Sequence, residues 1–254
     1  MQQEKLKIPP RSEALKLFQK YVLFSNVEEH CVTVATVAMY LAQKVKAKKI
    51  PNLNLDIVFA TSLFHDLGKG IVIEKLEPVK YGFKKFTLEQ MKTWKLLRQL
   101  HKPLQDIYND LNSTHSHLDK RVHETDVVSI IAGALYPDFI HYIYQIGGTR
   151  NEVYFNASPE IKIMHYADWI VHHKSHIIPF DARLDFLFDK YWTELTTEQR
   201  ADRKQKEFAL EKDIFKGLDI TPDTLNLKEI NKLKTKLFKG QYDFFQIDKI
   251  DKIE

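Results

Sequence analysis

The chain has little of several residue types on which other classes of protein depend. Its 254 residues include one cysteine, 8 glycines and 9 prolines. The single cysteine, Cys31, excludes an internal disulfide and is typical of proteins from reducing compartments. Alternating β-branched segments are almost missing as well. With so few glycines and prolines, this pattern favours a mainly helical chain.

Long hydrophobic runs and a strong excess of one charge are also missing. No apolar stretch approaches the roughly 20 residues that a membrane-spanning helix needs. Residues 1–5, MQQEK, are too polar to begin a signal peptide. We therefore expect a cytoplasmic protein with no membrane partner. The formal charge is only +4, and its lysine clusters lack interleaved aromatics, which argues against long nucleic acid as a partner.

Helical periodicity, with matching start and stop signals, runs through most of the chain. Its length allows one large or two small domains. We predict an all-α domain at 12–195, preceded by an N-terminal segment at 1–11 and followed by a helical C-terminal extension and tail at 196–254. The helices expected from these signals span 12–24, 27–45, 54–68, 87–102, 121–135, 137–146, 159–179, 181–195, 196–216 and 221–238.

The most informative motif is the adjacent pair His65 and Asp66, which ends a run of small and apolar residues. Burying such groups is costly unless they are paired or bind a metal, and together they suit Mn, Fe, Zn, Ni or Mg. Two further candidates are His30, on the apolar face of its helix, and Asp168, between apolar neighbours. Taken singly, His30 is more often an ordinary buried histidine, and Asp168 has a salt bridge to Lys174 or to a nearby arginine as its alternative.

In chain order, His30, His65-Asp66 and Asp168 form the pattern H…HD…D. The doublet continues as LGK, and Asp168 lies in the segment MHYADW. With these surroundings, residues from about 12 to about 220 resemble the HD-domain superfamily of metal-dependent phosphohydrolases. The resemblance implies an HD-domain helical bundle in which these four side chains bind a divalent cation.

The resemblance also implies the reaction, which is hydrolysis of a phosphate ester or anhydride by water that the cation activates. Asp66 is expected to be both a ligand and a catalytic residue. We expect one ion, of Mn, Mg, Fe, Ni or Zn. Many family members bind a second ion through further histidines, and Gln145 stands near the expected position of one of these, with His141 one turn earlier. His123 matches the first of them and is expected to contact phosphate or donate a proton.

Other side chains are candidates for binding the substrate. Lys69 lies one turn after the doublet on the same side of the helix, where an ammonium can contact phosphate. Its alternative is an ordinary solvated lysine. Arg183 matches a family position near the pocket and is a further phosphate contact. His115 and His117 are alternatives to His123, although exposed loop histidines usually have no such role.

Three histidines, His172, His173 and His176, follow Asp168 closely. His172 is four residues from Asp168 and is expected to hydrogen-bond that carboxylate. A separate zinc site is a weaker interpretation of the cluster, because no cysteine accompanies it.

We therefore expect a soluble HD-type phosphohydrolase whose substrate is a nucleotide or another small phosphorylated metabolite. The sequence contains neither a Walker-type glycine loop with its lysine nor a serine nucleophile elbow. Two alternatives stay open: a single-strand nuclease, and a non-catalytic regulatory or ligand-binding module in which the metal is structural. Catalysis needs open coordination positions that face a cleft, whereas a regulatory module can fill them with side chains.

Overall fold

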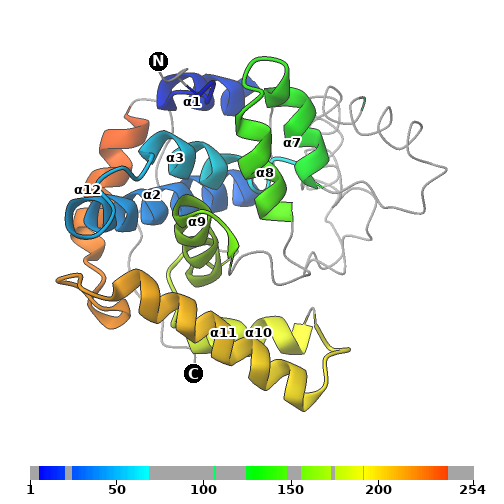
Figure 1. Ribbon diagram of the computed structural model, residues 1–254, viewed down its shortest axis with the longest axis vertical. Coiled ribbons are helices and arrows are strands. Elements are labelled where there is room, and N and C mark those ends of the chain that lie inside the picture. The colour runs from blue at the N-terminus through cyan, green and yellow to red at the C-terminus, as the bar shows by residue number, and fades with distance from the viewer. Residues whose placement is uncertain are drawn as a thin grey trace, which may run out of the picture.

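The structure is a computed structural model that describes residues 6–20, 25–68, 106, 124–147, 156–172, 175–190 and 192–239. Within these ranges the protein is all-α, as predicted, and the only β-type pairing is an isolated bridge between Val171 and Ile177. The helices, shown in Figure 1, are α1 (Arg11–Lys20), α2 (Ser25–Lys48), α3 (Leu55–Phe64), α7 (Glu124–Gly133), α8 (Phe139–Gly147), α9 (Pro159–Ile170), α10 (Phe180–Lys190), α11 (Thr197–Phe215), the short 3-10 helix η4 (Pro222–Thr224) and α12 (Leu227–Phe238).

Helices α2, α3 and α9 form the centre of the molecule. Every side chain of α2 from 31 to 42 is buried, and so is every side chain of α3 from 57 to 64. A helix that is apolar on all sides needs neighbours on all sides, and α3 packs against α1, α2, α8 and α9. Figure 1 shows α7 and α8 on one side of this centre and α12 on the other. These contacts bring the beginning of α2, the end of α3 and the end of α9 next to one another.

Asn54 starts α3 and ties it to α9. Its side-chain oxygen accepts hydrogen bonds from the backbone N–H groups of Asp56 at 3.0 Å and Ile57 at 3.4 Å. Two of the N–H groups that a helix start leaves unpaired are thereby satisfied. The backbone N–H of Asn54 donates to the carboxylate of Glu160, in the first turn of α9, at 3.0 Å. The cap therefore holds the start of α3 against the start of α9.

Substituting Asn54 should cost measurable stability because its side-chain oxygen accepts hydrogen bonds from two backbone N–H groups. Asn54→Ala is expected to lower the free energy of unfolding by about 1 kcal/mol, measured by urea denaturation. Asn54→Ser keeps an accepting oxygen and is the matched control, expected to lose less than half as much. Equal losses in the two variants would show that the side-chain oxygen does not cap the helix.

The C-terminal helices pack onto the same core. Helix α11 contacts α9 and α10, and α12 contacts α2. Ile230 and Phe238 of α12 are fully buried, and the Phe238 ring lies 5.7 Å from that of Phe59 in α3. The predicted boundary between residues 195 and 196 stays a prediction. None of the described helices is long and apolar enough to cross a membrane.

Three of the predicted helices end earlier than expected. Helix α9 stops at Ile170 rather than near 179, because the chain becomes extended at Val171, which pairs with Ile177. Helix α3 stops at Phe64, before Gly68, because the chain tightens into a turn in which the Leu67 N–H donates to the Phe64 carbonyl at 3.0 Å. Helix α10 stops at Lys190 rather than near 195. The predicted helix at 87–102 lies outside the described residues.

Helix α12 begins later than predicted, at Leu227 rather than Thr221. The Thr221 N–H donates to the hydroxyl of Thr224 at 2.8 Å, which closes the separate turn η4. Asn226 then caps α12, with its side-chain oxygen accepting from the Glu229 N–H at 3.1 Å. Each of the two short segments therefore has its own cap, Thr221 for η4 and Asn226 for α12, and a single long helix from Thr221 was the wrong interpretation.

Candidate metal centre

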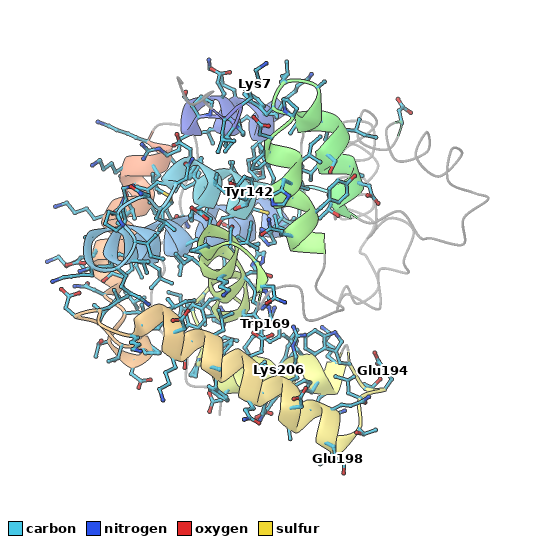
Figure 2. The ribbon with its side chains drawn as sticks, viewed as in Figure 1. Lys7, Tyr142, Trp169, Glu194, Glu198 and Lys206 are labelled. Carbon is cyan, nitrogen blue, oxygen red and sulfur yellow. The ribbon has the colours of Figure 1, made fainter. Side chains whose placement is uncertain are left out.

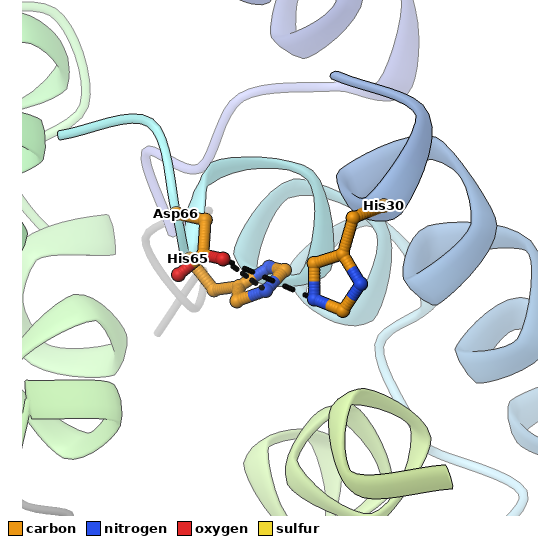
Figure 3. Close-up of side chains that lie close together, drawn as sticks. All are labelled: His30, His65 and Asp66. Carbon is orange, nitrogen blue, oxygen red and sulfur yellow. Dashed lines mark ion pairs between the residues drawn. The ribbon is translucent and has the colours of Figure 1, made fainter. Parts of the chain in front are cut away.

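Three central helices bring the residues of the HD pattern together. His30 lies near the beginning of α2, His65 is the residue that ends α3, and Asp66 is in the turn that follows. Asp168 lies in the last turn of α9. Counted over the whole residue, His30, His65 and Asp66 are each no more than 6% exposed. In Figure 3 the carboxylate of Asp66 is turned toward the rings of both histidines.

The side chains approach each other through a single set of four atoms. Oδ1 of Asp168 lies 3.0 Å from Nε2 of His30 and 3.3 Å from Nε2 of His65. Oδ2 of Asp66 lies 3.5 Å from Nε2 of His65 and 3.9 Å from Nε2 of His30. The four side chains of the motif therefore lie together, although 138 positions of the chain separate His30 from Asp168.

The opposite nitrogen of each imidazole is bound to a backbone carbonyl. Nδ1 of His65 lies 2.7 Å from the carbonyl oxygen of Ser62, and Nδ1 of His30 lies 3.3 Å from that of His172. A carbonyl can only accept, so these contacts assign the N–H to Nδ1 in both rings. Each Nε2 faces the carboxylates, where a proton or a shared cation can join the two groups.

The two histidines also control the charge on Asp168. Burial alone raises the pKa of this carboxyl, but the charge and hydrogen bonds of His65 and His30 outweigh it and hold the pKa well below its usual range. The side chain of Asp168 is 33% exposed, whereas the side chains of His30 and Asp66 are each 8% exposed. The site consequently opens to solvent on the Asp168 side.

This donor set fits one divalent cation. Two ligands bound at right angles with bonds of about 2.1 Å lie about 3 Å apart. The distances between nitrogen and oxygen donors, 3.0 to 3.9 Å, need only a small contraction to reach that value. Two imidazole nitrogens and two carboxylate oxygens suit Mn, Fe, Zn, Ni or Mg. His30, His65 and Asp66 alone already form a buried group whose donor atoms lie within 4.8 Å of one another.

Comparison with known proteins agrees with this geometry. The family model for the HD domain matches residues 27–173, more than half of the chain. The chain belongs to the HD domain family. The matched range contains all four residues of the centre, so the HD domain is the part of the chain that builds it. No match was found among curated proteins or among solved structures.

The roles predicted for several other site residues are not tested by the described part of the chain. Lys69 and His123 lie outside the described residues, as do His115 and His117, and their roles stay predictions. Arg183 lies in the first turn of α10 with its guanidinium 5.4 Å from the centre of the Phe186 ring, and its contact with phosphate also stays a prediction.

Gln145, which stands near the expected place of a second-metal histidine, has a structural contact. Its side-chain oxygen accepts a hydrogen bond from the backbone N–H of Ser158 at 3.0 Å. Ser158 is the N-cap of α9, and its own side chain makes no capping hydrogen bond. Gln145 of α8 thus satisfies a backbone donor at the start of the helix that carries Asp168.

The supporting contacts of the HD centre were missed from sequence. His172 was expected to bond Asp168 through its ring, and that contact stays a prediction. The contact that the structure records is between its carbonyl and His30. Residue identity gives no signal for a backbone carbonyl, so neither this contact nor the one from Ser62 could be read from the chain.

A buried polar network between α9 and α11 was not predicted from the sequence either. Nε2 of His165 lies 3.2 Å from the carboxylate of Glu207, a fully buried residue of α11. The guanidinium of Arg203 lies 2.7 Å from the same carboxylate and 5.5 Å from the ring of Trp169. Figure 2 labels Trp169 of α9 beside α11, the helix that carries Lys206. The one sequence signal was the spacing of four between Arg203 and Glu207.

Proposed function

We propose that the protein is a metal-dependent phosphohydrolase that acts on a nucleotide or another small phosphorylated metabolite. The observation that carries the proposal is the convergence of two imidazole Nε2 atoms and two carboxylates, with both Nδ1 atoms engaged by carbonyls. Imidazoles oriented in this way offer lone pairs to a cation. Membership of the HD domain family supports the same reaction class.

His30, His65, Asp66 and Asp168 would hold the ion. When bound, a divalent cation supplies a water acidic enough to attack near neutral pH and polarises the phosphoryl group. Asp66 is the group best placed to accept a proton from that water, because it lies beside His65 at the edge of the centre. The exposure of Asp168 gives water and substrate a way in on that side.

Phosphate binding is assigned to residues other than the four proposed metal ligands. We propose Lys69 and Arg183 as cationic contacts to the substrate phosphate, and His123 as a further contact or as the proton donor to the leaving group. The mild net charge of +4 favours a small anionic substrate over long nucleic acid. The single cysteine supports a cytoplasmic location.

A substrate panel tests the proposal. Purified protein is supplied in turn with Mn, Mg, Ni and Zn and assayed with nucleotides, para-nitrophenyl phosphate and single-stranded oligonucleotides. Release of phosphate from small substrates with at least one metal is the expected result. Hydrolysis of oligonucleotides alone would make the protein a nuclease. Tight metal binding without any turnover would favour the non-catalytic regulatory module.

The number of ions can be measured independently of activity. Protein purified without chelator should contain close to one divalent ion per chain, because Gln145 offers an amide where a second site would need an imidazole. The metal content is determined by mass spectrometry on weighed protein. A reproducible value of two ions, with His123 among the ligands, would contradict the mononuclear centre.

A further inference from the structure

A tight turn follows α9 and touches the metal centre. Val171 and Ile177 pair across it as an isolated antiparallel bridge. Within the turn, the backbone N–H of His172 donates to the His176 carbonyl at 2.8 Å, and the backbone N–H of Ser175 donates to the His172 carbonyl at 2.7 Å. These contacts fix the backbone at His172 from both directions. We use the name 171–177 turn for the described residues of this segment, 171, 172 and 175–177.

The carbonyl of His172 has two hydrogen-bond donors. One is the backbone N–H of Ser175 at 2.7 Å, and the other is Nδ1 of His30 at 3.3 Å. A carbonyl oxygen has two lone pairs and can accept both. The position of this oxygen therefore helps to set the ring orientation of His30 through a hydrogen bond from Nδ1. That orientation turns Nε2 toward the carboxylates of the centre.

Ser175 has an unusual backbone conformation. Its φ is 62°, the only positive φ at a non-glycine position among the described residues. This left-handed region disfavours residues with a Cβ, and it disfavours β-branched residues most. Such conformations persist where the surrounding structure fixes them, and they cluster at functional sites. Here the conformation directs the Ser175 N–H at the oxygen that also receives His30.

Side chains of the turn hold it against α10. The ring of His172 stacks on that of His176, with centroids 4.7 Å apart and planes 25° apart. The His172 ring also meets the ring of Phe186 in α10 edge-on at 5.7 Å. Val171 and Ile177, which begin and end the turn, are 0% and 2% exposed. The carbonyl that faces His30 is thus held on a well-anchored element.

We infer that the 171–177 turn is a positioning element for the metal ligand His30, and that the left-handed conformation of Ser175 keeps it in the required shape. Ser175 is a positioning residue, because it acts on the centre only through the His172 carbonyl. The inference rests on the proposed metal site for its consequence. The hydrogen bond from His30 to the turn exists independently of any ion.

Substitutions at Ser175 that differ in their tolerance of positive φ test the inference. Glycine and asparagine adopt this conformation readily, whereas valine and threonine do not. Ser175→Gly and Ser175→Asn should bind Mn²⁺ within about 3-fold of the unmodified protein. Ser175→Val should bind it about 10- to 100-fold more weakly, the usual cost of losing a contact that orients a ligand. Ser175→Thr is the milder substitute should Ser175→Val fail to fold. Binding is followed by the signal of free Mn²⁺ in electron paramagnetic resonance.

A second readout requires no metal. Nitrogen-15 NMR of the histidine rings should show a hydrogen-bonded proton on Nδ1 of His30 in the unmodified protein and in the glycine and asparagine variants. In Ser175→Val, Nδ1 of His30 should no longer carry that hydrogen-bonded proton. Asn226→Ala, which removes the cap of α12, is the control for general destabilisation. It should lower the melting temperature by about 2–4 °C and leave Mn²⁺ affinity unchanged.

The two proposals fail in different ways. If the valine and threonine variants bind Mn²⁺ as tightly as the asparagine variant and keep the His30 proton on Nδ1, the positioning role is wrong and the metal site stands. If the unmodified protein binds no Mn²⁺ but its His30 tautomer changes in Ser175→Val, the turn does position His30 and the proposed metal site is wrong.

Discussion

Asp66→Ala should lower kcat/KM for the best phosphate substrate by at least about 100-fold and should weaken metal binding at the same time. The carboxylate lies 3.5 Å from Nε2 of His65 and 3.9 Å from Nε2 of His30, on the buried side of the site. Its loss leaves two imidazoles and only one carboxylate. A hard cation is then held by less negative charge, and the proposed proton acceptor is gone. Steady-state kinetics together with a Mn²⁺ titration measure both effects.

Asp56→Ala is the matched control for this variant. Asp56 lies at the first turn of α3, the helix that ends at His65, and pairs with Arg11 at 3.0 Å in an exposed salt bridge. Its removal should leave metal affinity and kcat/KM within about 2-fold, since exposed pairs contribute little. If Asp66→Ala kept both bound metal and near-normal hydrolysis, the HD centre would not be the active site. The regulatory module would then be the better account.

Glu207→Ala should destabilise the fold by about 3–5 kcal/mol, the usual result of removing one partner from a buried ion pair. Glu207 is fully buried and lies 3.2 Å from Nε2 of His165 and 2.7 Å from the guanidinium of Arg203. Without the carboxylate, these two basic groups stay next to each other with their shared partner removed. For a chain of this size the melting temperature should fall by about 8–15 °C.

A second carboxylate on α11 provides the comparison. Asp202 forms an exposed pair with Lys206 at 2.8 Å, one turn apart on the same helix. Asp202→Ala should cost less than about 0.5 kcal/mol, because such pairs on a helix surface are weak. Urea denaturation of both variants gives the two free energies. A loss below about 1 kcal/mol for Glu207→Ala would mean that the buried network does not hold α11 to α9.

The residues of the centre could be predicted from sequence because their chemistry conflicts with their surroundings. His65 and Asp66 end a helix that is apolar on every side, and Asp168 lies among buried residues of α9. Burying a polar group in such a place is costly unless it is paired or binds a metal. The positions of these residues along the chain therefore indicate a shared site. The all-α fold could be predicted from a different signal, the helical periodicity of the apolar residues.

The contacts that orient those residues could not be predicted. The carbonyls of Ser62 and His172 are present in any residue, so only the backbone path reveals that they meet His65 and His30. Ser175 gave no signal either, because nothing in its side chain indicates a positive φ. The late start of α12 could not be predicted either, because Thr221 and Asn226 are both suitable N-cap residues. Thr221 caps the short helix η4, and Asn226 caps α12.

Anomalous diffraction from a crystal grown with Mn²⁺ tests the central claim most directly. The account predicts one strong peak, within about 2.0–2.6 Å of Nε2 of His30, Nε2 of His65 and one carboxylate oxygen each of Asp66 and Asp168. A peak elsewhere in the molecule, or one that His30 and Asp168 do not touch, would contradict it.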